Sequence, residues 1–415
     1  MTDSVLVGLA LIPVLAVAAQ LLAVRLALPS IVVLLAVGFL AGAPSWGLDP
    51  DELLGDTLFP FVSLAVAVIL FEGGLTLRIA EIRGGTHKVV RRLLGLGVVA
   101  TWAAIAIIAV LVLDVAPTLA VLIGAILVVS GPTVVGPLLD FIGIGGRTGS
   151  ILRWEGILVD PIGAIVAILV LHAIDAGESF SSSEGVVGFV ESVGWGAVVG
   201  VAGAALLLYL LYVADLPRSL QAVTTLATVL GVFVAAGVLR EDSGYVSVVL
   251  MGAIMANQSR VETREIHEFK ETIGLLLTGV LFIILSARIS PGELADAAGP
   301  ALVLLAFVVI VIRPLAAWLS CLGSRLDWRE RTLIASLAPR GIVAASTASI
   351  ASISLADDNV LGLDLLVPTV FIVIVGTVTI YGIGTPILAR ALGLAGPGVA
   401  TDEDFVGVIE VGQEE

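Results

Sequence analysis

About thirteen apolar segments dominate this chain, and most contain the roughly 20 residues that a helix needs to span the hydrocarbon of a bilayer. The chain is 59% hydrophobic and 13% charged, which is far from the composition of a soluble domain. We therefore predict an all-α polytopic membrane protein with about 13 transmembrane helices. The segments lie near residues 4–24, 29–43, 57–75, 89–113, 117–136, 151–173, 186–213, 219–238, 244–256, 270–287, 300–323, 331–353 and 364–390.

Lysine and arginine residues fall almost entirely into alternate loops between these segments, and this pattern predicts the orientation of the chain. If the N-terminus is outside, the outside loops contain only Arg240 and Arg288 as basic residues. Those loops are acidic instead, as in DPDELLGD at 49–56 and DAGESFSSSE at 175–184. We predict a multi-pass protein of the cell membrane with its N-terminus outside and its C-terminus in the cytoplasm.

Charged and reactive residues exclude several classes of function. The net charge of −15 argues against a nucleic-acid partner. The single cysteine, Cys321, excludes an intramolecular disulfide, and the sequence contains no legible catalytic triad, metal cluster or phosphate loop. We expect a protein that is not an enzyme, needs no cofactor and has the lipid bilayer as its surroundings. Residues 393–415 are predicted to be an acidic cytoplasmic tail or the start of a regulatory domain.

Two of the apolar segments are interrupted by proline and glycine. One break is SGPTVVG at 130–136, with Gly131 and Pro132, and the other is APRGIV at 338–343, with Pro339 and Gly341. The second break lies seven segments after the first, which is the offset expected if two inverted six-helix repeats are joined by one linking helix. A break exposes free carbonyls and hydroxyls, here those of Ser130 and Thr133, and such oxygens suit a bare cation. We predict that the two broken helices form an ion site.

Two carboxylates lie inside the segment RWEGILVDPIGAIV at 153–166, although a charge within a bilayer is costly. Glu155 and Asp160 point about 140° apart on a helix, so we expect them to have different partners. We predict that Glu155 pairs with Arg340 from the second break, which leaves Asp160 free to bind a cation or a proton in competition. Arg313, in VIRPLAAWL, is expected to snorkel or to bind a helix end.

A third acid, Glu72 in ILFEGGLTL at 69–77, lies before two glycines and is a further candidate for ion binding. The competing interpretation is a carboxylate at the inner end of a helix that faces water.

The motifs ILFEGGL, SGPTVVGPLL, RWEGILVDP and LAPRGIVAA occur in an order that resembles the NhaP-type monovalent cation/proton antiporters, relatives of the sodium/proton exchangers. The resemblance covers roughly residues 5–392. It implies an NhaA-like fold with inverted six-helix repeats and two crossed, broken helices, assembled as a homodimer. The implied division is dimerisation helices 1–3 at 1–77, core helices 4–6 at 88–175, linker and dimerisation helices 7–10 at 186–290, and core helices 11–13 at 300–392.

The resemblance also implies roles for residues. Asp160 matches the essential ion-binding aspartate, and Glu155 and Arg340 match a structural ion pair. Ser130 matches a threonine whose backbone carbonyl is a cation ligand, and Glu72 matches a glutamate of the ion site in some members. The implied function is exchange of Na⁺, K⁺ or Li⁺ for H⁺, electroneutral at one to one, by elevator-like movement of the core.

This chain departs from the family pattern at three places. Val159 replaces an asparagine, Gly156 replaces a frequent serine, and Gly131 replaces an aspartate between Ser130 and Pro132. Fewer oxygen ligands would weaken a preference for sodium, so a K⁺-selective proton antiporter is a second hypothesis. Less favoured hypotheses are a transporter of organic anions on the same fold and a pH sensor or channel.

Overall fold

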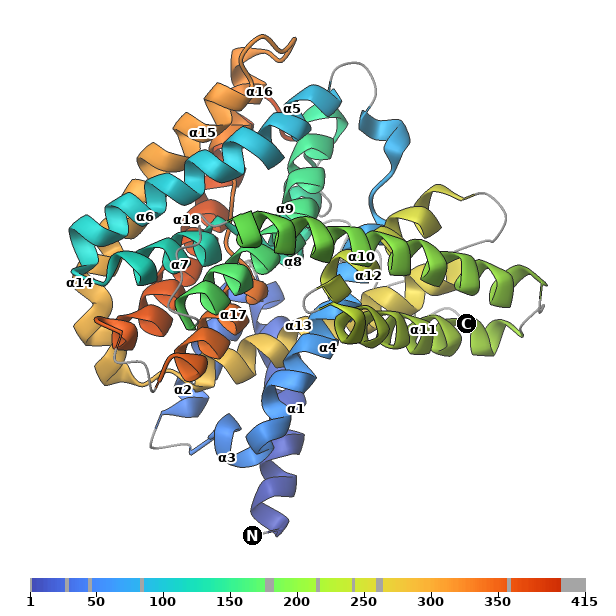
Figure 1. The fold of residues 1–415 in the computed structure, drawn as a ribbon, viewed down its shortest axis with the longest axis horizontal. Helices are drawn as coiled ribbons and strands as arrows, with labels where there is room; N and C mark the ends of the chain where they lie inside the picture. The colour runs from blue at the N-terminus through green and yellow to red at the C-terminus, as the bar shows by residue number, and fades with distance from the viewer. Residues whose placement is uncertain are drawn as a thin grey trace.

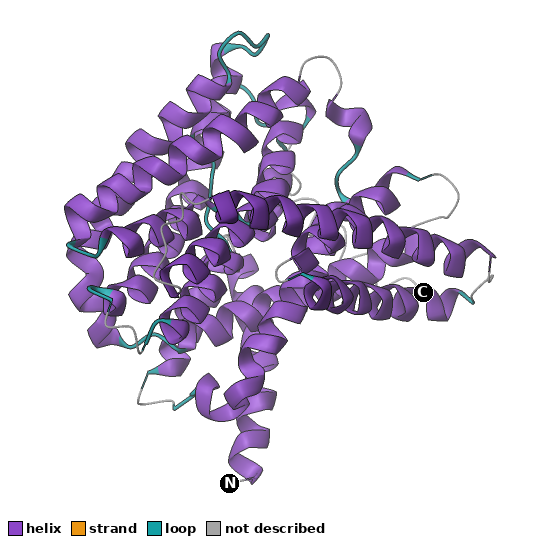
Figure 2. Ribbon diagram, in the orientation of Figure 1, coloured by secondary structure: helices purple, strands orange, loops and turns teal. Residues whose placement is uncertain are grey.

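The computed structural model describes residues 2–26, 30–43, 47–82, 86–175, 183–213, 217–240, 243–258, 264–356 and 360–396. Every regular element within these ranges is a helix, as Figure 2 shows. The α-helices are α1 (Thr2–Leu26), α2 (Ser30–Gly42), α3 (Pro50–Leu54), α4 (Leu58–Leu75), α5 (Thr86–Arg92), α6 (Val98–Leu113), α7 (Pro117–Val128), α8 (Pro132–Ile142), α9 (Gly146–Asp175), α10 (Ser183–Leu208), α11 (Arg218–Leu239), α12 (Ser243–Asn257), α13 (Arg264–Ala287), α14 (Pro291–Phe307), α15 (Arg313–Ser320), α16 (Trp328–Ala335), α17 (Ile342–Ser354) and α18 (Leu366–Leu392). Short π-helical segments follow three of them, η3 (Leu93–Gly97), η4 (Tyr209–Val213) and η5 (Val308–Ile312). Three 3₁₀ turns complete the order, η1 (Gly55–Thr57), η2 (Ile79–Ile82) and η6 (Leu363–Leu365).

The prediction of an all-helical polytopic membrane protein is confirmed. In the part of the chain that the structure describes, eight helical stretches are long and apolar enough to cross a membrane. Five further apolar helices are shorter, among them α2, α7 and α17. Each apolar segment expected from the sequence falls on a helix or on a pair of consecutive helices. The number of helices that cross the bilayer stays a prediction.

The helices pack in two neighbourhoods. In the first, α12 packs against α4, α10 and α11, and α13 packs against α1 and α2. In the second, α6 packs against α7 and α14, α9 against α7 and α17, and α18 against α14 and α17. Figure 1 shows α10, α11 and α12 extending to one side, away from α6, α14 and α15. The second neighbourhood contains the two breaks and the buried charges.

The two interrupted helices are confirmed, and their breaks touch. Helix α7 ends at Val128 and α8 begins at Pro132, while α16 ends at Ala335 and α17 begins at Ile342. The N–H of Gly131 donates to the carbonyl of Pro339 over 3.3 Å. Proline favours these breaks because it has no N–H to continue a helical ladder.

Candidate functional site

Asp160 lies on the face of α9 that packs against the break between α7 and α8. A Cβ on Gly156 would lie 3.3 Å from the side chain of Val135, and one on Gly163 would lie 2.4 Å from that of Val129. Asp160 falls between these glycines and within about 60° of both around the helix. The small residues thus let α9 approach the segment that contains Ser130, and Asp160 lies on the side of the helix that faces this segment.

Two buried oxygens at this contact have no hydrogen-bond partner within the described part of the chain. They are Oδ1 of Asp160, whose residue is 2% exposed, and Oγ of Ser130, whose residue is 4% exposed. Buried polar atoms are normally hydrogen-bonded, so each such exception calls for an explanation. A carboxylate and nearby carbonyl oxygens are the ligand types that a hard monovalent cation binds.

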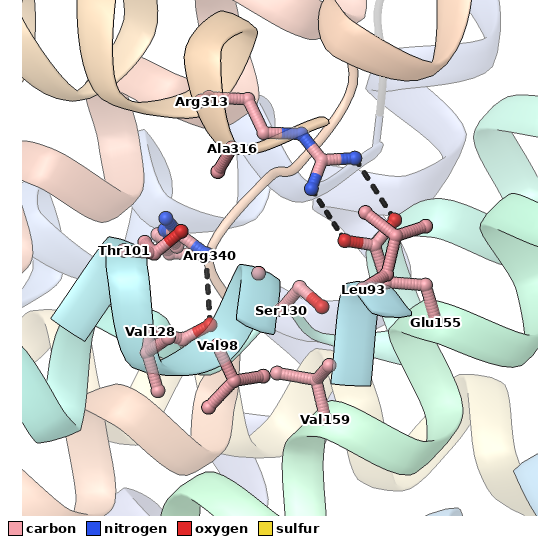
Figure 3. A pocket seen from close by; sticks show the side chains of 11 residues that line it. Leu93, Val98, Thr101, Val128, Ser130, Glu155, Val159, Arg313, Ala316 and Arg340 are labelled. Carbon is pink, nitrogen blue, oxygen red and sulfur yellow. Dashed lines mark hydrogen bonds and ion pairs between the residues drawn. The ribbon is translucent and has the colours of Figure 1, made fainter. Parts of the chain in front are cut away.

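Glu155 forms a buried ion pair with Arg313, which corrects the predicted pair with Arg340. Arg313 Nη1 donates to Glu155 Oε1, and Nη2 donates to Oε2 over 2.9 Å, as Figure 3 shows. The same Nη2 also donates to the carbonyls of Ile334 and Leu337, both over 2.8 Å. Arg313 therefore binds the end of α16, which is one of the two roles expected for it, and it neutralises Glu155 as well.

Arg340 binds the C-terminal end of α7 and not Glu155. Its Nη1 donates to the carbonyls of Val128 over 3.0 Å and Val129 over 3.3 Å, at the end of α7. Its own backbone N–H donates to the Thr377 hydroxyl over 3.1 Å. A cation at a helix C-terminus satisfies orphan carbonyls and opposes the negative end of the helix dipole. The break was expected to leave free carbonyls for a cation, but the carbonyls of Val128 and Val129 are bound by Arg340, because the second break places this side chain directly on the first.

A small cavity of about 20 Å³ lies between the ion pair and Arg340, with room for about one water molecule. Its polar lining comes from Thr101, Ser130, Glu155, Arg313 and Arg340, and Figure 3 shows Ser130 between Arg340 and the ion pair. Asp160 does not line this cavity. Its absence there agrees with the angle of about 140° that separates it from Glu155 on α9.

Val159, one of the three departures named in the sequence, lines the apolar side of the same cavity. It is 3% exposed and packs in a cluster with Val98 and Val128. The position is therefore filled by hydrocarbon and offers no oxygen to an ion.

The remaining predicted ligands lie elsewhere or outside the described side chains. The Glu72 carboxylate lies against Gly274 of α13, because a Cβ on that glycine would come within 1.8 Å of it. Glu72 does not line the cavity, and its part in the ion site stays a prediction. The backbone of Thr133 lies in the first turn of α8, but the side chains of Thr133 and Pro132 lie outside those that the structure describes.

Thr377 is a site residue that the sequence analysis missed. It is fully buried, accepts from the Arg340 N–H and donates to the carbonyl of Ile374 over 3.1 Å. Thr369, Thr377 and Thr385 recur every eight residues in an apolar helix, and all three are buried. Each step of eight residues turns by about 80° around the helix, so the three do not share one face. The signal that could have identified them is the recurrence of hydroxyl side chains in an otherwise apolar run.

Comparison with known proteins gives a family match. The model for the sodium/hydrogen exchanger transmembrane family matches residues 10–391. The family is one of membrane exchangers, in agreement with the expectation that the chain is not an enzyme.

Individual relatives agree with this match. A K⁺/H⁺ antiporter of Shewanella oneidensis is 27% identical over 324 residues, which is 77% of this chain and 55% of that protein. The Na⁺/H⁺ antiporter 1 of Methanocaldococcus jannaschii is 25% identical over 338 residues, covering 79% of this chain and 78% of the relative. The chain thus spans about half the length of the Shewanella relative.

The fold also matches a solved structure. A sodium/proton antiporter of Methanocaldococcus jannaschii, determined at pH 8, aligns with a TM-score of 0.80 over 93% of this chain and 100% of the other, at 22% sequence identity. At that identity the likeness concerns the fold.

Proposed function

Because the chain belongs to the sodium/hydrogen exchanger family, we propose that it is a secondary antiporter that exchanges a monovalent cation for protons across the membrane. The observation that supports this most is Asp160. Its carboxylate is buried, faces a broken helix, and has one oxygen without a partner among the described residues. Glu155 is neutralised by Arg313, so among the described side chains Asp160 is the acid at the crossing whose charge is available for exchange.

In the proposed mechanism Asp160 binds the cation or the proton, but not both. The Ser130 backbone carbonyl, Thr133 and Glu72 supply further oxygens to the cation. Two sets of hydrogen bonds support a fixed geometry for the crossing. Arg340 donates to the carbonyls of Val128 and Val129. The N–H of Gly131 donates to the carbonyl of Pro339. A single exchanging carboxylate gives one proton per cation, so the exchange is electroneutral.

We further propose thirteen membrane-spanning helices in two inverted repeats, with the N-terminus outside and the C-terminus in the cytoplasm. The core helices 4–6 and 11–13 move relative to helices 1–3 and 7–10, which form a homodimer in the cell membrane. The contact between breaks from the two halves of the chain supports the repeat. The packing of α13 against α1 and α2, in the neighbourhood without the two breaks, supports the assignment of these helices to the dimerisation part.

A K⁺/H⁺ antiporter is the second candidate, and one observation favours it. Val159 places a buried apolar side chain beside Asp160 where a polar ligand is usual in the family pattern, and Gly156 adds no hydroxyl. A site with fewer side-chain ligands discriminates less in favour of the smaller ion. Organic anion transport is disfavoured, because Arg313 and Arg340 are both bound to protein oxygens.

Exchange in proteoliposomes tests the proposal. With a pH gradient imposed and lumenal pH reported by a dye, addition of Na⁺, K⁺ or Li⁺ should release protons from the lumen, with or without a voltage clamp. Asp160→Asn should abolish the response while the protein still elutes and melts as a folded species. Normal exchange in Asp160→Asn would refute the mechanism, and a response that follows voltage would refute the one-to-one stoichiometry.

A further inference from the structure

A group of exposed basic residues outside the ion site has no role in the exchange described above. We call it the basic rim: Lys88, Arg91 and Arg92 of α5, and Arg325 in the turn after α15. The two parts are more than 200 residues apart in sequence, yet Arg92 Nη1 donates to the carbonyl of Leu322. Helix α15 also packs on η3, the segment that continues α5, and Figure 1 shows α5 and α15 side by side.

Directly beside the basic rim the surface becomes apolar. Leu96 is 74% exposed and Val99 58% on one helix, while Trp318 is 41% and Leu322 53% exposed on the other. Arg92 and Leu96 are one helical turn apart, or about 6 Å along the axis. In a membrane-spanning chain, such a change marks the level at which headgroups give way to hydrocarbon. The exposed Trp318 and Trp328 flank the rim, as aromatic residues do at membrane interfaces.

The charges of the rim have no acidic partner in the part of the chain that the structure describes. Within the described residues, no carboxylate lies within ion-pair distance of Lys88, Arg91, Arg92 or Arg325. By contrast, Arg147 at the same end of the molecule lies 3.9 Å from Glu330. The nearest acid in sequence is Asp327, and its carboxylate accepts from the N–H of Trp328 over 2.7 Å.

We infer that the basic rim binds the headgroup of an anionic phospholipid, with the phosphate between α5 and Arg325 and the acyl chains along Leu96, Trp318 and Leu322. Basic clusters at the headgroup level bind anionic lipids, and each added charge strengthens that attraction. The adjoining lipid-facing surface distinguishes this ligand from a soluble phosphate, since a soluble anion gains nothing from exposed leucine and tryptophan. The site lies on α5 and on the turn after α15, which pack on the helices of the ion pair and lie away from α10–α12, so it is independent of the proposed homodimer.

Lipid titration of the full chain in detergent tests the inference. Phosphatidylglycerol and phosphatidylcholine with identical acyl chains are compared by native mass spectrometry and by the shift in melting temperature. We expect tighter binding and a larger shift with phosphatidylglycerol, and the difference should shrink as salt rises. Equal effects of the two lipids, or the same shift with inorganic phosphate alone, would overturn the proposal.

Variants locate the site. Lys88→Gln/Arg91→Gln/Arg325→Gln removes three charges but keeps Arg92, which also binds a carbonyl. Affinity for phosphatidylglycerol should fall about fivefold per charge, or about a hundredfold in all. The matched control Arg25→Gln/Arg147→Gln/Arg390→Gln removes three exposed charges elsewhere and should bind normally. Unchanged binding in the first variant, or equal loss in the control, would contradict the assignment.

Discussion

The backbones of Gly131 and Gly341 touch where the two broken helices cross: a Cβ built on Gly341 would lie 2.6 Å from the Cα of Gly131. No flexible side chain could move aside to make room for a Cβ at this contact, because both partners are backbone atoms. The neighbouring hydrogen bond from Gly131 to Pro339 fixes the same pair of breaks. The geometry around Asp160 therefore depends on two glycines that contribute no functional group.

Replacing Gly341 with alanine should disrupt the crossing. The added methyl group must push the breaks apart, which costs about 1–3 kcal/mol or more of stability and displaces Ser130 from Asp160. We expect a lower melting temperature and strongly reduced exchange. Gly384→Ala, in α18, is the control: a Cβ there would meet nothing within 4 Å, so the substitution should be neutral. Normal exchange in Gly341→Ala would show that the close contact is dispensable.

A double-mutant cycle should assign the partner of Glu155. Loss of either member of the Glu155–Arg313 pair leaves a buried charge alone, at a cost of about 3–5 kcal/mol. Glu155→Gln and Arg313→Met should therefore each lower the melting temperature sharply, and the double variant should recover much of the loss. The cycle between Glu155→Gln and Arg340→Met should give little coupling. The reverse result would restore the pair expected from the sequence.

Thr377→Val removes one hydrogen-bond acceptor from the second break and should destabilise the structure there. The substitution keeps the side-chain shape but leaves the buried N–H of Arg340 without a partner, at a cost of about 1–3 kcal/mol. We expect reduced thermal stability and slower exchange. Thr377→Ser, which keeps the hydroxyl, should retain most of both. A loss in Thr377→Ser as large as that in Thr377→Val would contradict the assignment to the hydrogen bond, because serine retains the accepting hydroxyl.

The sequence was sufficient to predict the helical class, the two breaks and the candidate acid, because each has a local cause. Apolar length predicts a span, proline and glycine predict a break, and a lone aspartate in an apolar run marks a functional group. Partner choice is a tertiary property. Arg340 and Arg313 are both intramembrane arginines, and nothing local in the sequence says that the π-helical segment η5 precedes Arg313 or that α15 faces Glu155. Thr377 was missed for the same reason, since its acceptor role depends on a contact 37 residues away.

Ser130→Ala distinguishes the backbone of this residue from its side chain. The hydroxyl has no partner among the described residues and lines the cavity beside the ion pair, whereas the proposed cation ligand is the backbone carbonyl. Alanine keeps that carbonyl, so the concentration of cation that gives half-maximal exchange should change by less than about threefold, well under 1 kcal/mol. A rise of tenfold or more would instead assign the hydroxyl to the ion.

Competition at Asp160 predicts how exchange depends on pH. If one carboxylate binds either species, protons displace the cation, so the apparent KM for the cation should rise steadily as the pH falls. The maximal rate at saturating cation should change much less over the same range, since excess cation displaces the proton. At high pH the rate should fall for the opposite reason, because too few protons reach the site to complete the return step. Initial rates measured across pH and cation concentration in proteoliposomes, with equal pH on both sides and isotopic cation as tracer, separate the two effects. A KM that is independent of pH would mean that the proton and the cation bind at different groups, and Glu72→Gln would then be the next variant to measure.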